Sequence, residues 1–148
     1  MKVEISIEHN ITEPVALIRT PSLTSELVAL VEMLEKASTQ AYLLTAKKDD
    51  KSFVIEPDKI DIIRSEGGVI TCFNQEGQDF VVNRPLNELI ERLGSNFIRI
   101  SKSAIININR IDHLSPSFNR TVHVVMKSGV SDYVSKGYLS DFKRRLGL

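Results

Sequence analysis

The stretch NFIRISKSAIININRI, residues 96–111, is the most informative part of the sequence for predicting the fold. Two largely apolar runs, residues 97–100 and 104–108, flank a polar island formed by Ser101, Lys102 and Ser103. Short apolar runs rich in isoleucine favour buried strands. The sequence therefore predicts two apolar strands that hold three short polar residues at their junction, and an exposed tip of this kind indicates a binding role.

The charge of the chain is unevenly distributed, although its formal net charge is zero over 148 residues. Residues 1–94 carry 10 Lys or Arg against 16 Asp or Glu, whereas residues 95–148 carry 9 against 3. A basic C-terminal part favours a polyanionic partner, although charge can also cluster by chance on solvated faces. A single cysteine, Cys72, and an N-terminus unlike a secretory signal indicate a reducing, cytoplasmic location.

Residues 1–50 are predicted to form a small α+β N-terminal lobe. Apolar alternation predicts a strand at residues 3–7. Further strands are expected at residues 15–19, after Pro14, and at residues 41–45. Leucines and a valine at helical spacing predict a helix over residues 23–34. The apolar stripe of this helix either packs on its own lobe, which we favour, or joins two chains.

Residues 51–148 are predicted to be mainly β, with helices at residues 86–93 and 137–146. Gly67 and Gly68 form a typical hairpin turn between two of the strands. The expected strands are residues 53–55, 60–63, 69–73, 80–82, 97–100, 104–108, 111–115, 121–126 and 130–134.

Catalytic chemistry finds little support in the sequence. The three histidines show no metal-ligand spacing with one another or with Cys72, and no phosphate-binding loop or nucleophile motif occurs. The Ser-Lys pairs at residues 101–102 and 135–136 place neighbouring side chains on opposite faces of a strand, where they exchange protons poorly. We therefore expect no enzymatic activity, no metal and no cofactor.

Residues 96–107 resemble the central signature of the LytTR family of bacterial DNA-binding domains. The shared pattern is a phenylalanine, an arginine, a short polar pair, a serine and then apolar residues that end in asparagine. The apolar residues 60–63, together with Leu86 and Leu89, have the family's upstream spacing, and residues 135–138 resemble its closing serine, basic residue and tyrosine. The resemblance covers about residues 56–148.

This resemblance implies a fold class that is mainly β, an elongated LytTR-type domain of small stacked β-sheets with short helices. It also implies sequence-specific binding of double-stranded DNA by a transcriptional regulator whose loops enter successive major grooves. Position by position, Lys102 and Lys136 fall where the family contacts DNA. The full set of candidate DNA-binding residues is Gly67, Gly68, Ser101, Lys102, Ser103, Arg120, Ser135 and Lys136.

Three departures from the family pattern affect these contacts. Ser101 and Lys102 stand where the family often has histidine and then arginine or asparagine, and Lys136 stands where it usually has arginine. Because lysine lacks the bidentate fork of arginine, we expect weaker base discrimination at residue 136. Gly68 offers no side chain for a third contact.

The expected partners follow from the same resemblance. Residues 1–50 are too short for a phosphoacceptor receiver, so the chain resembles stand-alone regulators of this family. We expect promoter DNA with tandem half-sites, a homodimer at least on DNA, and a membrane protein that restrains the regulator as a candidate partner. The alternative is an all-β protein-interaction module whose basic C-terminal end binds an acidic protein. The charge asymmetry fits both readings, whereas the polar island favours DNA binding.

Overall fold

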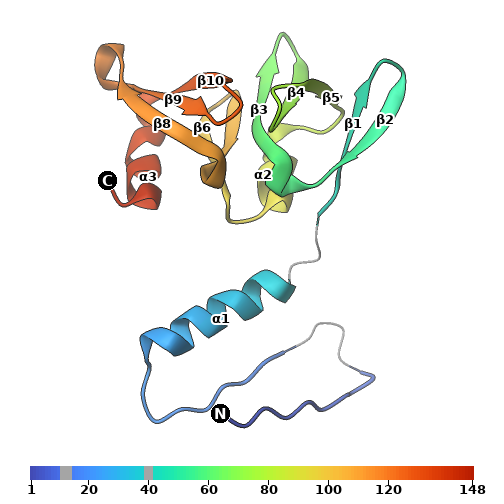
Figure 1. Cartoon of the computed structure of the whole chain (residues 1–148), viewed down its shortest axis with the longest axis vertical. Coiled ribbons are helices and arrows are strands. Elements are labelled where there is room, and N and C mark those ends of the chain that lie inside the picture. The colour runs from blue at the N-terminus through green and yellow to red at the C-terminus, as the bar shows by residue number, and fades with distance from the viewer. Residues whose placement is uncertain (11–14, 39–41) are drawn as a thin grey trace. The chain divides into compact units, whose positions relative to one another are not determined.

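The structure is a computed structural model that describes residues 1–10, 15–38 and 42–148 (Figure 1). The chain divides into two compact units, Met1–Gln40 and Ala41–Leu148. The predicted boundary between residues 50 and 51 falls in the turn of a hairpin of the second unit.

The first unit has one regular element in its described residues, the helix α1 (Ser25–Ser38). The strands predicted at residues 3–7 and 15–19 are wrong, because neither segment pairs with a neighbour. Val3, Ile5 and Ile7 are all at least three-quarters exposed. Alternation alone does not make a strand, since backbone N–H and C=O groups need a partner strand to bond.

The second unit contains ten strands and two α-helices within its described residues (Figure 1). All paired strands are antiparallel, and they form a seven-stranded sheet in the order β2-β1-β5-β4-β3-β7-β6 and a three-stranded sheet in the order β10-β9-β8. The elements are β1 (Leu44–Lys48), β2 (Lys51–Ile55), β3 (Ile60–Glu66), β4 (Val69–Asn74), β5 (Asp79–Val82), α2 (Leu86–Leu93), β6 (Phe97–Ser101), β7 (Ala104–Asn107), β8 (Ile111–Pro116), β9 (Val122–Met126), β10 (Ser131–Val134) and α3 (Lys136–Leu146). The strand predicted at residues 41–45 is β1, and residue 41 lies outside the described residues.

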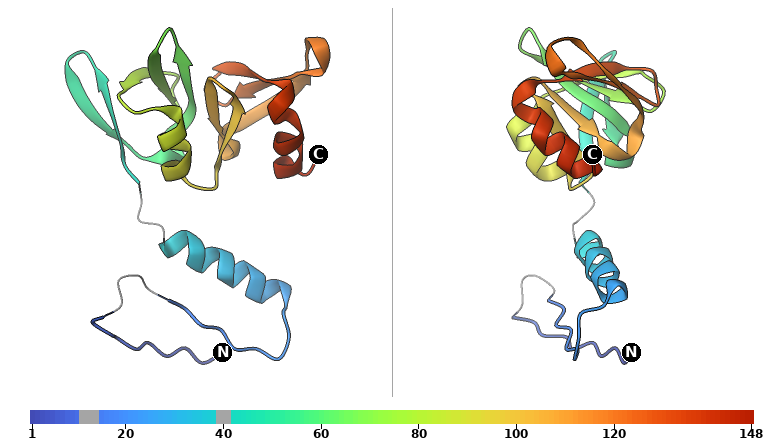
Figure 2. Two further views of the ribbon diagram at one scale, coloured as in Figure 1. Left: turned by 180° about the vertical axis from the view of Figure 1, so that it is seen from behind. Right: turned by 90° about the vertical axis from the view of Figure 1, so that its left-hand side faces the viewer.

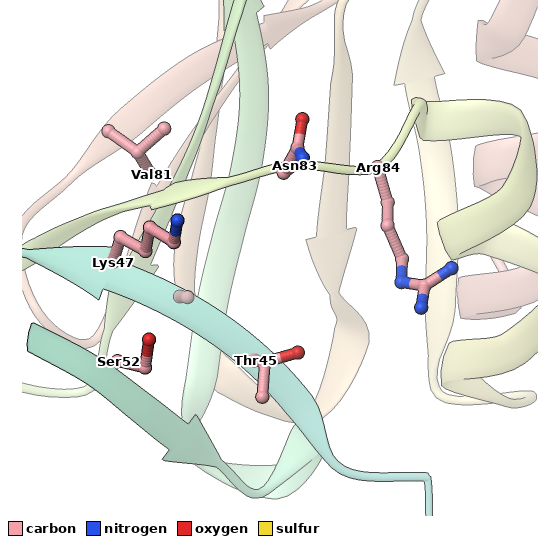
Figure 3. A pocket seen from close by; sticks show the side chains of 7 residues that line it. Thr45, Lys47, Ser52, Val81, Asn83 and Arg84 are labelled. Carbon is pink, nitrogen blue, oxygen red and sulfur yellow. The ribbon is translucent and has the colours of Figure 1, made fainter.

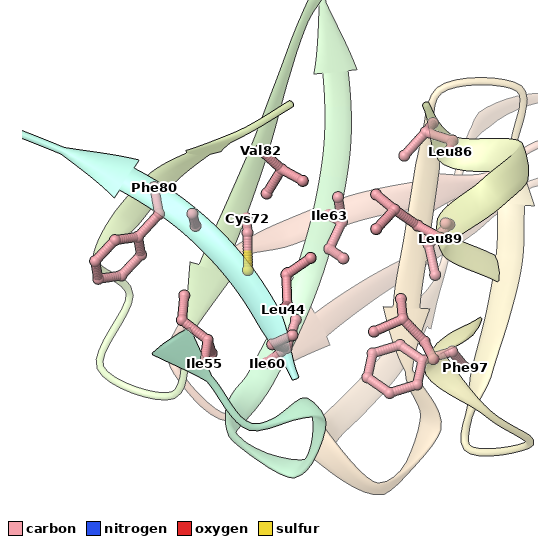
Figure 4. Packing of buried hydrophobic residues seen from close by; sticks show 13 residues of the cluster. Leu44, Ile55, Ile60, Ile63, Cys72, Phe80, Val82, Leu86, Leu89 and Phe97 are labelled. Atoms are coloured by element: carbon pink, nitrogen blue, oxygen red, sulfur yellow. The ribbon is translucent and has the colours of Figure 1, made fainter. Parts of the chain in front are cut away.

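The three adjacent strands β3, β7 and β6 form a wall between two hydrophobic cores. In β7, Ile105 belongs to the first core while Ala104 and Ile106 belong to the second. This division follows from the period of two along a strand, which sends successive side chains to opposite faces. The first core (Figure 4) comprises Leu44, Ala46, Ile55, Ile60, Ile63, Cys72, Phe80, Val82, Leu86, Leu89, Leu93, Phe97 and Ile105, and the second comprises Ile62, Ile98, Ile100, Ala104, Ile106, Val124, Met126, Val134 and Phe142.

One helix packs on each core. The helix α2 turns Leu86, Leu89 and Leu93 into the first core, a spacing of three and four that keeps them on one face. The helix α3 packs on the second core through Phe142, which is fully buried. The helix is therefore held against the second core, although its other face is exposed.

A buried carboxylate links the two sheets. Asp61 of β3 has no exposed surface, and it accepts hydrogen bonds from Nε of Arg110 at 2.7 Å and from the backbone N–H of Ser128 at 3.0 Å. Ser128 lies in the turn between β9 and β10, so the carboxylate joins the large sheet to the small one. A buried charge is tolerated only when it is paired and hydrogen-bonded, as it is here.

Two further side chains that can form hydrogen bonds are buried, Asn107 at the end of β7 and Cys72 within the first core. Asn107 donates from its side chain to the backbone oxygen of Ile60 at 3.0 Å and accepts from the N–H of Asn109 at 3.0 Å, so its side chain has a structural role. Burial, followed by the nearby negative charge of Asp61, raises the pKa of the Cys72 thiol to about 12. Cys72 is therefore a packing residue.

Candidate nucleic-acid interface

The polar island forms the tip of the hairpin between β6 and β7. Ser101 pairs with Ala104, so Lys102 and Ser103 make the turn. The side-chain oxygen of Ser101 accepts from the N–H of Ser103 at 3.1 Å, which tightens this turn. Lys102 is exposed, and within the described residues its side chain has no ion-pair partner. Its ammonium group is therefore free to contact an external acceptor.

Arg99 braces this tip from below. Its guanidinium donates to the backbone oxygen of Lys102 at 2.5 Å and to that of Ser101 at 3.3 Å. It also donates to the side-chain oxygen of Asn87 in α2 at 2.9 Å. One planar group thus ties both carbonyls of the turn to a helix, a pattern that suits the fixed donor fork of arginine. The sequence marks Arg99 only as a signature residue and gives no sign of this bracing role.

The turn between β3 and β4 lies beside the polar tip. Gly67 and Gly68 have φ values of 57° and 80°, which confirms the predicted hairpin turn because two residues in this region are typical of a tight hairpin. The N–H of Ser65 donates to the backbone oxygen of Ser103 at 2.8 Å. The two turns are therefore held together, and both glycines are exposed there.

The junction of β10 and α3 lies on the other side of the polar tip. The N–H of Ser135 donates to the backbone oxygen of Ile100 at 2.8 Å, which attaches the junction to the end of β6. Ser135 is half-buried and Lys136, the first residue of α3, is exposed. Lys102 on the β6–β7 turn and Lys136 at the start of α3 therefore lie on neighbouring connections.

Arg120 lies at the tip of the hairpin between β8 and β9. Val122, two residues later, pairs with Val134 at the end of β10, so this tip is adjacent to the junction that carries Lys136. Arg120 is exposed. Figures 1 and 2 show the β3–β4, β6–β7 and β8–β9 turns on the same side of the second unit. The structure thus gathers all eight candidate residues on one side of this unit.

A separate shallow hollow lies between β1, β2 and β5, away from the candidate residues (Figure 3). Its cationic side chains are Lys47 and Arg84, and Arg84 pairs with Glu88 at 2.7 Å. The hollow is lined by Thr45, Ala46, Lys47, Ser52, Val81, Asn83 and Arg84. This mixture shows no arrangement of groups typical of catalysis.

Two other kinds of site are missing from the part of the chain that the structure describes. No three histidine, cysteine, aspartate or glutamate side chains there lie close enough together to hold a metal ion. No described helix is long and apolar enough to cross a membrane.

Comparison with known proteins identifies relatives that cover most of the chain. The family model of the LytTr DNA-binding domain matches residues 50–147. The sensory transduction protein LytR of Staphylococcus haemolyticus is 34% identical over 107 residues, which are 72% of this chain and 41% of the relative. The transcriptional regulatory protein LytR of Staphylococcus aureus is 33% identical over 106 residues, which are 71% of this chain and 43% of that protein.

A more distant match extends over more of the chain. The sensory transduction protein LytT of Enterococcus faecalis is 26% identical over 121 residues, covering 81% of this chain and 50% of the relative. The chain therefore spans half or less of the length of these three relatives.

A solved structure confirms the predicted fold class. The LytTr DNA-binding domain of a response regulator from Bacillus cereus superimposes with a TM-score of 0.68 at 24% identity. The match covers 74% of this chain and 99% of that domain. The mainly β architecture with short helices is thus shared.

Proposed function

The chain belongs to the LytTr DNA-binding domain family, and from this premise we propose that the protein binds double-stranded promoter DNA sequence-specifically and regulates transcription. The observation that carries this proposal is the pair of exposed lysines, Lys102 and Lys136, on neighbouring rigid junctions of one surface. The excess of positive charge in residues 95–148 supports a polyanionic partner for the same part of the chain.

In the proposed complex, the loops of this surface enter the major groove. Lys102 and Lys136 donate to guanine acceptors or to phosphates, and the hydroxyl groups of Ser101, Ser103 and Ser135 add shorter contacts. At Gly67 and Gly68 the exposed backbone approaches the DNA without a side chain, and no other part of the protein lies within 4 Å of the position that a Cβ would take at either glycine. Arg120 extends the contact at the β8–β9 turn. Promoter DNA implies action in the cytoplasm.

Lys102→Ala tests the central contact. We expect the variant to keep its fold and to lose about 1–3 kcal/mol of binding free energy on the duplex that the full chain selects from a random-sequence pool. The measurement is fluorescence anisotropy over a salt titration, with Lys127→Ala, an exposed lysine on the β9–β10 turn, as the matched control.

The outcomes of this test separate the candidate roles. An equal loss on random duplex would assign Lys102 to phosphate contact, and no loss on either DNA would remove it from the site. If the wild-type chain binds neither duplex with a steep salt dependence, DNA binding itself is contradicted and an acidic protein partner becomes the better reading.

Two copies of the chain are proposed to bind side by side on tandem half-sites, as a homodimer at least on DNA. The exposed apolar residues of α1, including Met33 at 67% and Leu34 at 41% exposure, support a role for this helix in bringing copies together. Half-sites one helical turn apart should bind the full chain more tightly than a single half-site does.

Gel shifts with altered spacers check the tandem arrangement. Moving one half-site by about half a helical turn places the second copy on the opposite face of the duplex, and cooperative binding should disappear. Equal affinity at every spacing would contradict the two-copy proposal.

Control of binding is proposed to be independent of phosphorylation, with a membrane protein that restrains the regulator as a candidate partner. Residues 1–40 support independence from phosphorylation, because their described part contains one helix and no strand and so does not form a phosphoacceptor receiver. A phosphodonor that the full chain needs for DNA binding would overturn the first part. Absence of the protein from the membrane fraction of its host under every condition would overturn the second.

A further inference from the structure

Phe118 is the most exposed aromatic side chain among the described residues. Its exposed fraction is 91%, compared with 53% for Tyr133 and 38% for Phe53. Leaving an aromatic ring of this size in water forgoes roughly 1.5–3 kcal/mol of burial free energy. Isolated apolar residues are common on protein surfaces, so exposure alone does not assign a role to Phe118. The conformation of its loop and the residues near that loop provide the further evidence.

The loop that carries Phe118 is tightly hydrogen-bonded. The backbone oxygen of Phe118 accepts from the N–H of Thr121 at 3.1 Å and from its hydroxyl group at 2.6 Å. The N–H of Ser117 donates to the backbone oxygen of Thr121 at 3.0 Å, which closes the loop. Asn119 and Arg120 both have positive φ values, of 56° and 61°. The ring is therefore displayed at the end of a defined turn, and few rotatable bonds separate it from the sheet.

The position of this turn links it to the candidate DNA surface. Pro116 and Val122 pair at its base, and Val122 also pairs with Val134, the last residue before the Ser135–Lys136 junction. Arg120 is two residues from Phe118 in the same turn and is exposed. An apolar ring and a cation thus stand together at the end of the row of turns that carries Lys102 and Lys136.

We propose that Phe118 is an apolar wedge that enters the minor groove next to the major groove contacted by Lys136, with Arg120 on the adjacent backbone. This inference rests on the proposed DNA-binding function and adds a second kind of contact to it. A phenyl ring finds little to bind on a phosphate ridge, and in the major groove it finds chiefly thymine methyl groups. The minor groove offers sugar walls and base steps. Apolar side chains inserted there separate the stacked bases and bend the duplex.

The test compares Phe118→Ser and Phe118→Leu in the full chain. The DNA is the duplex that the wild-type chain selects from a random-sequence pool, labelled at both ends for energy transfer. Wild type should bend this duplex. Phe118→Ser should lose most of the bend and about tenfold in affinity, with an unchanged salt slope because no charge is removed. Phe118→Leu should retain most of both properties, since leucine also serves as a wedge.

Arg120→Ala is the companion variant, and it should reduce the salt slope by about one unit through loss of one phosphate contact. Circular dichroism checks the fold of each variant, and little change is expected at such exposed positions.

The possible results distinguish the wedge from the function on which it rests. If wild type binds no selected duplex, both proposals fail. If wild type binds but leaves the duplex straight, or if Phe118→Ser matches wild type in affinity and bend, the wedge is overturned and DNA binding stands. A Phe118→Leu variant as defective as Phe118→Ser would likewise overturn the wedge.

Discussion

Asp61→Ala is expected to lower the free energy of unfolding by about 3–5 kcal/mol. The substitution leaves the guanidinium of Arg110, whose side chain is only 22% exposed, without the carboxylate that it contacts at 2.7 Å. It also removes the acceptor of the Ser128 N–H, so the turn between β9 and β10 loses its link to β3. Denaturation by urea, followed by circular dichroism, measures the change.

Asp112→Ala provides the matched control for this prediction. Its carboxylate is 57% exposed and contacts Nδ1 of His113 at 2.6 Å, so it is a surface aspartate with one partner. Exposed pairs contribute about 1 kcal/mol or less. If the two variants lost similar stability, the buried carboxylate would not be the link between the sheets that its contacts indicate.

Arg99→Ala is expected to weaken binding to the selected duplex by about 2–4 kcal/mol. Without the guanidinium, Lys102 and Ser103 are no longer held before binding, and ordering them on the DNA costs about 1–2 kcal/mol per residue. Arg99→Lys should restore little, because one ammonium group cannot reach Asn87 and two backbone oxygens with the geometry of the arginine fork. Anisotropy titrations on selected and random duplexes give the specific and non-specific affinities separately.

Arg84→Ala is the control for Arg99, since it also removes one arginine beside α2 but pairs with Glu88 and makes no contact with the turn. Its effect should be small and equal on both duplexes. An Arg99→Ala variant with unchanged preference for the selected duplex would show that the turn keeps its shape without the brace.

Most elements of the second unit could be predicted from sequence because each carries a local signal. The apolar spacing of residues 86–93 gives α2, and two glycines between apolar runs give the β3–β4 turn. The alternation at residues 3–7 is just as regular and yields no strand. The difference lies in the neighbours, because a strand depends on pairing that a local pattern does not encode.

The candidate site likewise has a part that the sequence predicts and a part that it does not. The resemblance selects Lys102 and Lys136 by position, and the structure places both on exposed junctions. The support beneath them could not be predicted, since the contact of Arg99 with Asn87 joins residues whose proximity depends on how α2 packs. Asp61 reads as one charged residue inside an apolar strand, and its partners lie about 50 and 67 positions further along the chain.

The wall between the two cores has a consequence for strand alignment. In most sheets a slip of one residue is prevented because it would move apolar side chains into water and polar ones inward. In β7 such a slip would exchange Ile105 with Ile106, two identical side chains that are both fully buried, so hydrophobicity alone barely opposes it. Asn107 breaks the ambiguity, because its side chain meets the oxygen of Ile60 in only one alignment. The Asn107 amide therefore fixes the register of β7. The position of Lys102 at the tip of the β6–β7 hairpin depends on this register.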